Sequence, residues 1–252
     1  MHPRVLSALL LALAFATPLA AGELLIPLAA GVAPDGTTYA TRVWVTNTGG
    51  AIRRWTPTFI AAGADGTRAA AGTPIAVAPG ATVLATNLAP AGQSGMLLVS
   101  GAPQLLITTR LEATGPGGAL RGGVAGPLVT GHQLAAGHAT LHLHGLSQKA
   151  GGLTTDIYLI NASRAPAQCT VDAFRDDGSR IASTVGYALP PLSLRTWAGA
   201  LAVLGATDVA EARVAVTCDQ AFYAWARVYK PGGAELNVMT PAHGLGRAVT
   251  TP

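Results

Sequence analysis

The chain contains the same pattern twice, and this internal repeat constrains its fold more than any other feature. The segment TRVWVTNTGGAIRRW aligns with TDIYLINASRAPAQC, which places Asn47 opposite Asn161. Farther along, LLITTRLE aligns with FYAWARVY, which places Arg110 opposite Arg227. Several matching blocks in the same order are the signature of a duplicated structural unit. The sequence therefore predicts two units of one fold, joined in tandem.

Each unit has the pattern of short antiparallel strands. The apolar runs are brief, often alternate with polar residues, and are separated by Asp-Gly, Pro-Gly and Gly-Gly pairs. Alternation with such turn residues is typical of hairpins, and about seven strands in a unit of roughly 105 residues are typical of a sandwich. We therefore predict an all-β protein of two tandem antiparallel β-sandwich domains of immunoglobulin-like type, residues 24–130 and 131–246, with a C-terminal tail at 247–252.

The TxxxVTNxG pattern that begins at Thr41 resembles the tandem immunoglobulin-like repeats of uncharacterised secreted bacterial proteins. More loosely, the two-unit organisation resembles the two-domain periplasmic chaperones of pilus assembly. Both resemblances imply two sandwich domains. The second would also imply an exposed edge strand that the protein presents to a client subunit.

The N-terminus has the three regions of a secretory signal peptide. Arg4 precedes an apolar run over 5–16, and Pro18 and small residues follow it. The run is shorter than the about 20 residues that a membrane-spanning helix needs. We therefore expect residues 1–21 to be a cleaved leader and the mature protein to be exported to the periplasm, the cell surface or the medium.

Charge and motif content exclude several classes of function. The net charge is +4, but charged residues make up only 11% of the chain and the basic ones are scattered. Nucleic-acid binding requires a dense basic patch with stacking aromatics, so we expect none. Paired carboxylates, a Gly-x-Ser-x-Gly motif and a phosphate-binding glycine loop are all missing from the sequence. We therefore expect a protein that is not an enzyme and needs no cofactor.

Two cysteines, Cys169 and Cys218, are the only ones in the chain, and both lie in the second unit. In an exported protein two cysteines most simply form a disulfide. A redox role would require a CxxC motif, which the sequence lacks. We therefore predict a structural disulfide, with Cα atoms about 4.4–6.8 Å apart.

Three of the six histidines lie in HATLHLHG, at His138, His142 and His144. On a strand, His142 and His144 would share one face with Cα atoms about 6.5–7 Å apart. That spacing permits a shared metal ion, although a zinc site needs at least three protein ligands. The other interpretation is that both side chains belong to the solvated face of an ordinary strand, and we prefer it.

The strand FYAWARVY predicts a binding surface. Alternation places Tyr223, Trp225, Arg227 and Tyr229 on one face, and the aligned strand of the first unit also has an arginine there. We interpret this as the outer face, with Asp156 and Tyr158 on a neighbouring strand and an Asp156–Arg227 pair across the sheet. Because Tyr, Trp and Arg dominate binding hot spots, the face is a candidate platform for a protein or glycan partner. The alternative is that the other unit or a loop covers it.

These features together predict an exported, non-enzymatic binding or structural protein of the cell envelope or surface, in adhesion, matrix or appendage assembly. A periplasmic metal-binding protein using His142 and His144, or a chaperone of the pilus type, is the alternative. A homo-oligomer or a filament is compatible with the sequence.

Overall fold

The computed structural model describes residues 19, 22–28, 30–32, 36–90, 92–100, 103–231 and 236–243. The predicted leader, apart from Leu19, and the predicted C-terminal tail lie outside these residues. Almost all regular structure is β, which confirms the predicted all-β sandwich class. No helix in the described ranges has the length and apolar character that a membrane crossing requires.

The first half of the chain forms two sheets. One has the order β10-β1-β7-β4-β5, and the other has the order β2-β3-β8-β9 with β6 also paired to β3. The strands are β1 (Leu24–Leu28), β2 (Ala30–Val32), β3 (Thr38–Asn47), β4 (Arg53–Ala61), β5 (Ile75–Val77), β6 (Thr82–Ala85), β7 (Gly95–Ser100), β8 (Leu105–Thr114), β9 (Leu120–Ala125) and β10 (Val129–Thr130), with the 3-10 helices η1 (Gly66–Arg68) and η2 (Gly131–Gln133).

The second half also forms two sheets, with orders β14-β13-β16-β11-β19 and β15-β12-β17-β18. Their strands are β11 (Thr140–Gln148), β12 (Thr154–Asn161), β13 (Ala167–Phe174), β14 (Arg180–Leu189), β15 (Ser193–Trp197), β16 (Val209–Cys218), β17 (Phe222–Tyr229), β18 (Leu236–Met239) and β19 (Ala242–His243), with one short helix, α1 (Ala200–Val203). Strand for strand, these orders repeat β5-β4-β7-β1-β10 and β6-β3-β8-β9 of the first half.

The repeat extends to the residues that face each other across strands. Arg42 lies opposite Arg110 on β3 and β8, and Asp156 lies opposite Arg227 on β12 and β17. We call such a row of directly opposed residues a rung. Arg110 and Arg227 therefore occupy the same rung of equivalent sheets, as the sequence alignment predicts.

Asn47 and Asn161 end equivalent strands and hold equivalent turns. The amide of Asn161 donates to the carbonyls of Ala165 (2.7 Å) and Pro190 (2.9 Å), and its oxygen accepts from the Ser163 N–H (2.9 Å). In the same way, the amide of Asn47 donates to the carbonyls of Ala51 (2.8 Å) and Val77 (2.9 Å), and its oxygen accepts from the Gly49 N–H (2.9 Å). Both side chains are fully buried. Because every polar atom of the side chain has a backbone partner, the repeated Asn is a structural residue.

Cys169 and Cys218 form the predicted disulfide between neighbouring strands β13 and β16, where they lie directly opposite each other. Their Cα atoms are 4.1 Å apart, slightly below the expected window. The Asp219 N–H donates to the Gln168 carbonyl on the adjacent rung, so the cysteines occupy a non-hydrogen-bonded rung. Opposed Cα atoms are closest on such rungs, at about 4.5 Å.

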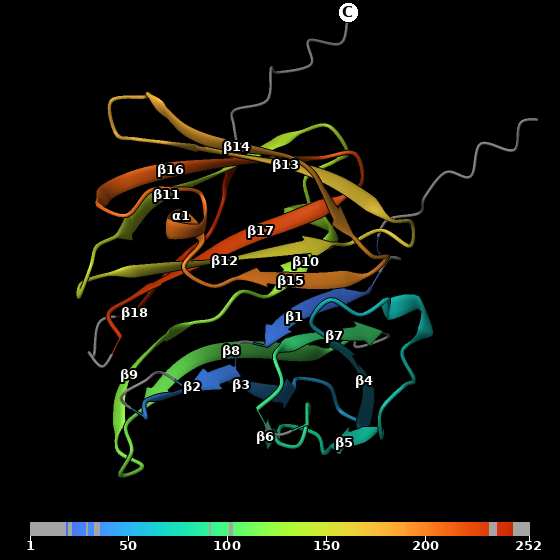
Figure 1. Cartoon of the computed structure of the whole chain (residues 1–252). Helices are drawn as coiled ribbons and strands as arrows, with labels where there is room; N and C mark the ends of the chain where they lie inside the picture. The colour runs from blue at the N-terminus through green and yellow to red at the C-terminus, as the bar shows by residue number, and fades with distance from the viewer. Residues whose placement is uncertain are drawn as a thin grey trace, which may run out of the picture.

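The four sheets are stacked as layers, with the second half above the first in Figure 1. Each half has its own core between its two sheets. A third buried cluster joins the halves, where the β10-β1-β7-β4-β5 sheet packs on the β15-β12-β17-β18 sheet. It contains Leu25, Tyr39, Ile60, Met96, Leu98, Leu111, Ala113, Val129, Tyr158, Ile160, Ala162, Leu192, Leu194, Tyr223, Trp225 and Leu236. The central strands of the two inner sheets, β7, β12 and β17, are therefore buried on both faces.

Candidate functional site

The predicted aromatic platform lies in the layer between the two halves. Asp156, Tyr158, Tyr223 and Trp225 are each 1–2% exposed, and Arg227 is 6% exposed. The interpretation of β17 as an outward, accessible platform is therefore wrong, and the alternative, that the other unit covers this face, is confirmed. This face packs on Tyr39 and on the outer side of the β1–β7–β4 sheet, which covers it as a partner would.

The buried face holds a paired charge among aromatic rings. Arg227 Nη2 donates to Asp156 Oδ2 at 2.5 Å, which confirms the expected cross-strand pair. Asp156 Oδ1 also accepts the Gly199 N–H at 2.9 Å. The Arg227 guanidinium lies 4.5 Å from the centre of the Tyr39 ring and 4.4 Å from that of Tyr229. Among the described residues, the Arg227 Nε and Nη1 groups have no hydrogen-bond acceptor, and cation–π contact with both rings stabilises the charge there.

Tyr158 and Trp225, two residues along each strand from the ion pair, lie on the same buried face. The rings of Tyr158 and Trp225 are stacked, with centres 3.9 Å apart and planes at 8°. Burial raises the pKa of Tyr158, and raises that of Tyr223 to about 12, so both phenols remain protonated. The site is a buried structural contact, and a ligand could reach it only if the halves separated.

One signal in the sequence indicates this burial. The strands β7, β12 and β17 are buried at nearly every position, without the alternation of a half-exposed strand. A continuous apolar run of this length is typical of a strand covered on both faces. The run GMLLV of β7 is continuously apolar. In β17, the arginine and the tyrosines interrupt the apolar run, so the sequence of that strand does not indicate burial on both faces.

The histidines lie on the outermost sheet of the second half. The rings of His142 and His144 are 6.1 Å apart on β11, while Leu141 and Leu143 point into the core. Arg213 Nη1 contacts His142 Nδ1 at 3.0 Å. Because arginine only donates, it occupies the Nδ1 lone pair and leaves the proton of the neutral ring on Nε2. Partial burial, then Arg213 and His144, lower the pKa of His142, which favours the neutral ring.

A three-ligand metal site does not form within the described ranges, where no three His, Cys, Asp or Glu side chains gather in a suitable arrangement. His138, the third predicted ligand, has left-handed backbone (φ 66°), and its N–H donates to the Cys218 carbonyl. The histidines are therefore not brought together into the predicted site.

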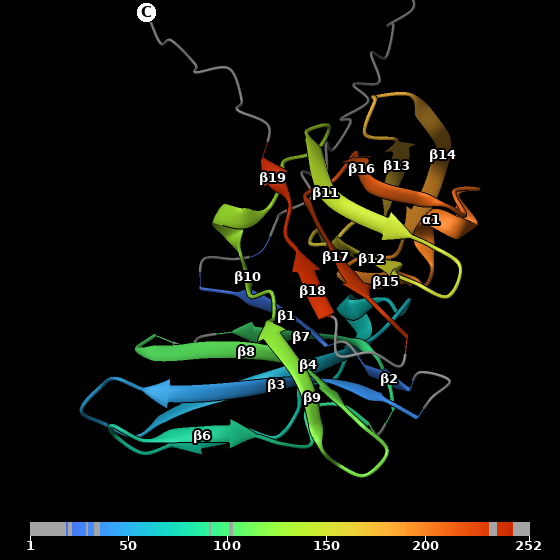
Figure 2. The ribbon, with the colours of Figure 1, turned by 90° about the vertical axis from the view of Figure 1, so that its left-hand side faces the viewer.

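The equivalent of the buried platform in the first half is exposed. We define the Trp44 face as the outer side of β6, β3 and β8, at the end of the stack remote from the second half (Figure 2). Its residues are Trp44, Leu84 and Leu106 at the centre, Thr46, Thr82 and Thr108 around them, and Arg42, Arg110 and Glu112 on the following rungs. Leu84 is 43% exposed and Leu106 is 56% exposed, and Trp44 is half-buried.

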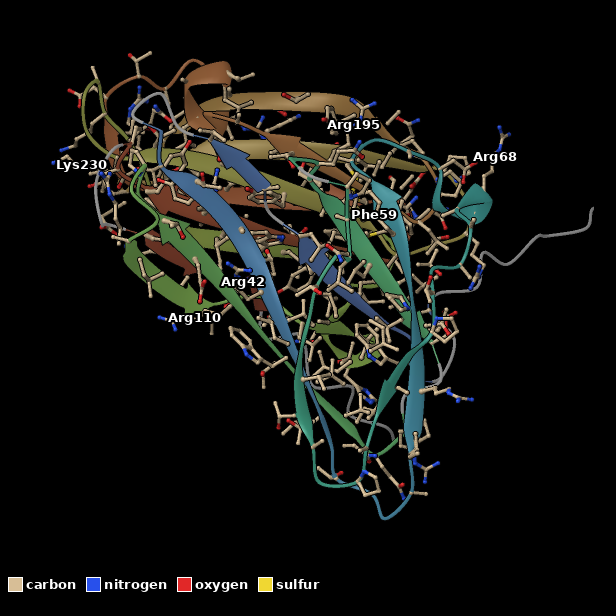
Figure 3. The ribbon with its side chains drawn as sticks, turned by 90° about the horizontal axis from the view of Figure 1, so that it is seen from below. Arg42, Phe59, Arg68, Arg110, Arg195 and Lys230 are labelled. Carbon is tan, nitrogen blue, oxygen red and sulfur yellow. A yellow bond between two sulfur atoms is a disulfide. The ribbon has the colours of Figure 1, made fainter. Side chains whose placement is uncertain are left out.

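The electrostatics of the Trp44 face are set by two arginines that share one carboxylate. Glu112 lies 3.3 Å from Arg42 Nε and 3.8 Å from Arg110 Nη1. Figure 3 shows the two arginines side by side on this face. Arg42 occupies the place that Asp156 holds in the buried layer of the second half. One acid therefore balances two bases, and the face carries a net positive charge beside an apolar centre.

A cavity of about 810 Å³ opens on the same half, between β4 and the segment 86–90. Phe59, labelled in Figure 3, is the aromatic residue of its lining, and the polar side chains there are Thr73, Thr86 and Asn87. Among the described residues, no titratable side chain lines this cavity.

Neither a scan of protein-family models nor a search of curated proteins finds a match for this chain. The residues and their geometry are therefore the basis for a functional assignment.

Proposed function

We propose that this is an exported, non-enzymatic structural or binding protein of the cell envelope or surface, and that it binds a protein partner through the Trp44 face. The single observation that carries the proposal is the fate of the equivalent face in the second half. There, Tyr158, Tyr223 and Trp225 on the equivalent rungs of the equivalent sheet are buried against a sheet of the first half. In the second half, this face of the fold makes a protein–protein contact.

The composition of the Trp44 face agrees with that use. Protein interfaces have an apolar, often aromatic centre and a polar rim, with arginine enriched. Trp44, Leu84 and Leu106 supply the centre, and threonines and arginines supply the rim. Single exposed apolar residues need no explanation, but a contiguous group on neighbouring strands marks an interaction surface.

Export is supported by one feature besides the leader pattern. The disulfide between Cys169 and Cys218 is typical of an oxidising compartment.

The test measures whether the Trp44 face is protected from a thiol reagent in the cells that produce the protein. Thr108→Cys places one thiol beside Trp44 on the exposed Trp44 face, and Ser183→Cys places one on the exposed outer sheet of the second half. In the producing cells, Thr108→Cys should react with a maleimide at least tenfold more slowly than Ser183→Cys. In the purified, dilute protein the two should react alike. Equal reactivity in both settings would refute the proposal.

A further inference from the structure

The cavity between β4 and the segment 86–90 borders the core of the first half, and the repeat shows what fills the equivalent place in the second. Ile75 lies opposite Trp55 on β5 and β4, and Tyr187 lies opposite Cys169 on β14 and β13. Trp55 and Cys169 are aligned in the repeat, so Tyr187 is the equivalent of Ile75. The second half therefore has a tyrosine where an isoleucine lines the cavity of the first half.

A second aromatic residue of the second half is also small in the first. Ala85 on β6 and Trp197 on β15 each lie opposite the residue four places before the repeated Asn, so they are equivalent. The rings of Tyr187 and Trp197 pack edge to face, with centres 4.6 Å apart, and both lie against the core of the second half. Ile75 and Ala85 are too small to make this contact.

The helix α1 fills more of this region in the second half. Asn87 and Gly199 occupy equivalent positions, and both have left-handed backbone (φ 57°). After Gly199 the chain forms α1, which lies between the sheets of β11 and β12 and buries Leu201 completely (Figure 1). Ala89 stands at the sequence position of Leu201 and is a partly buried residue of the cavity lining.

Three large side chains of the second half thus correspond to small ones in or beside this cavity. Such replacements in a packed core lower stability, more so where the space stays empty. Phe59 on β4 stands where the second half has Ala173 on β13, so it refills part of the space and adds an aromatic wall. The cavity that remains, about 810 Å³, lies within the roughly 300–1,000 Å³ typical of small-molecule sites.

The lining defines the chemistry that a ligand needs. Its apolar surface includes Phe59 and Leu88, and three exposed polar side chains, Thr73, Thr86 and Asn87, offer hydroxyl and amide groups. Since no charged side chain lines the cavity among the described residues, an ionised group would enter it without a counter-charge, which is costly. The equivalent space in the second half accepts tyrosine and tryptophan rings, which combine an apolar body with one polar group. Both observations favour a neutral aromatic ring.

We propose that this cavity binds a small, neutral aromatic molecule with the size and polarity of a phenol or an indole. The ring takes the place that Tyr187 and Trp197 fill in the second half and lies against Phe59. Its hydroxyl or N–H group bonds to the Asn87 amide or to a threonine of the lining. The site is separate from the Trp44 face, and the inference does not depend on the proposed function.

The first test is titration of the purified protein with 5-fluoroindole and 4-fluorophenol, followed by the fluorine NMR signal of each probe. We expect saturable binding, with dissociation constants on the order of 1 mM or below for molecules of about ten heavy atoms. The charged analogue 4-fluorobenzoate should bind at least tenfold more weakly. Failure of both neutral probes to bind would overturn the inference. Equal binding of 4-fluorobenzoate, or displacement of the probes by methyl glucoside, would overturn the neutral aromatic class.

The second test places the binding in the cavity. Thr86→Trp puts a ring into the cavity from an exposed position and should weaken binding of 5-fluoroindole at least tenfold. Leu84→Trp, two residues earlier on the outer side of β6, is the matched control and should leave the affinity within twofold. Both positions are exposed, so both variants should keep the thermal midpoint of the parent. Binding that Thr86→Trp leaves unchanged lies elsewhere on the protein and overturns the inference.

The third test gives the first half the residues that fill this place in the second. The triple variant Phe59→Ala, Ile75→Tyr and Ala85→Trp reproduces the residues of the second half at these three positions. It should abolish binding of 5-fluoroindole, because its own rings then occupy the site. A folded triple variant that binds the probe as tightly as the parent would overturn the inference. If the triple variant does not fold, Thr86→Trp decides the question by itself.

Discussion

The buried ion pair between the halves makes a sharp prediction about stability. Replacing Asp156 by Ala leaves the Arg227 guanidinium charged in a layer where it is 6% exposed. Within the described part of the chain, its Nε and Nη1 have no hydrogen-bond acceptor even in the parent protein, and Asp156 supplies the counter-charge. The change also removes the acceptor of the Gly199 N–H. The contacts with the rings of Tyr39 and Tyr229 would remain.

Breaking a buried pair by removing one partner costs about 3–5 kcal/mol, because it leaves an uncompensated buried charge. We expect the Asp156→Ala variant to lose about 4 kcal/mol of unfolding free energy. At about 2–4 °C per kcal/mol for a chain of this size, the thermal midpoint should fall by roughly 8–16 °C. Replacing both partners, as Asp156→Leu with Arg227→Met, should return stability to within about 2 kcal/mol of the parent, because no charge is then buried.

Urea unfolding followed by tryptophan fluorescence measures these differences. Trp225, which is stacked on Tyr158 two residues along each strand from the ion pair, reports on the layer itself. The matched control is Glu112→Ala in the first half, where the partner Arg42 side chain is 47% exposed. An exposed pair of this kind is worth at most about 1 kcal/mol. The reasoning fails if Asp156→Ala costs less than 1 kcal/mol, or if the double variant is as unstable as the single one.

Three further perturbations have expected outcomes. Reducing the Cys169–Cys218 disulfide opens a loop with a sequence separation of 49 and should cost up to about 4 kcal/mol in the chain-entropy model, measured as the shift in urea midpoint with and without reductant; an unchanged midpoint would contradict it. Asn47→Ala and Asn161→Ala should each lower the free energy of unfolding by about 3 kcal/mol, because each leaves several backbone groups without the hydrogen bond that the amide now makes. A loss below 1 kcal/mol in either variant would contradict the shared structural role. The lowered pKa of His142 means that the unfolded chain binds a proton more readily, so its contribution to stability is complete above the unfolded pKa of about 6.5 and is lost as the pH falls toward the folded pKa. His142→Gln should therefore flatten the slope of thermal midpoint against pH below 6.5, and an unaltered slope would show that other groups cause it.

The sequence by itself determined the class of fold and its local construction. Strand alternation, turn residues and the repeat predicted the β-sandwich, because side-chain period and turn chemistry are local properties. The same reasoning placed Asn47 and Asn161 at equivalent turns, paired Cys169 with Cys218, and put His142 and His144 on the solvated side of their strand.

Only the tertiary structure decided which sheet faces are covered. Alternation separates the two faces of β17 but carries no information about what packs on the polar one, so Trp225 and Arg227 were predicted to be exposed and are buried. The deciding contacts come from β1, β4 and β7, at least 120 residues away in the chain, and from the long-range choice of which two sheets meet. The same choice left Trp44 and Leu106 uncovered, although they stand on the rungs equivalent to those of Tyr158 and Tyr223. Burial of a face is a property of the assembled layers, because the free energy of covering it depends on the partner surface as much as on its own residues.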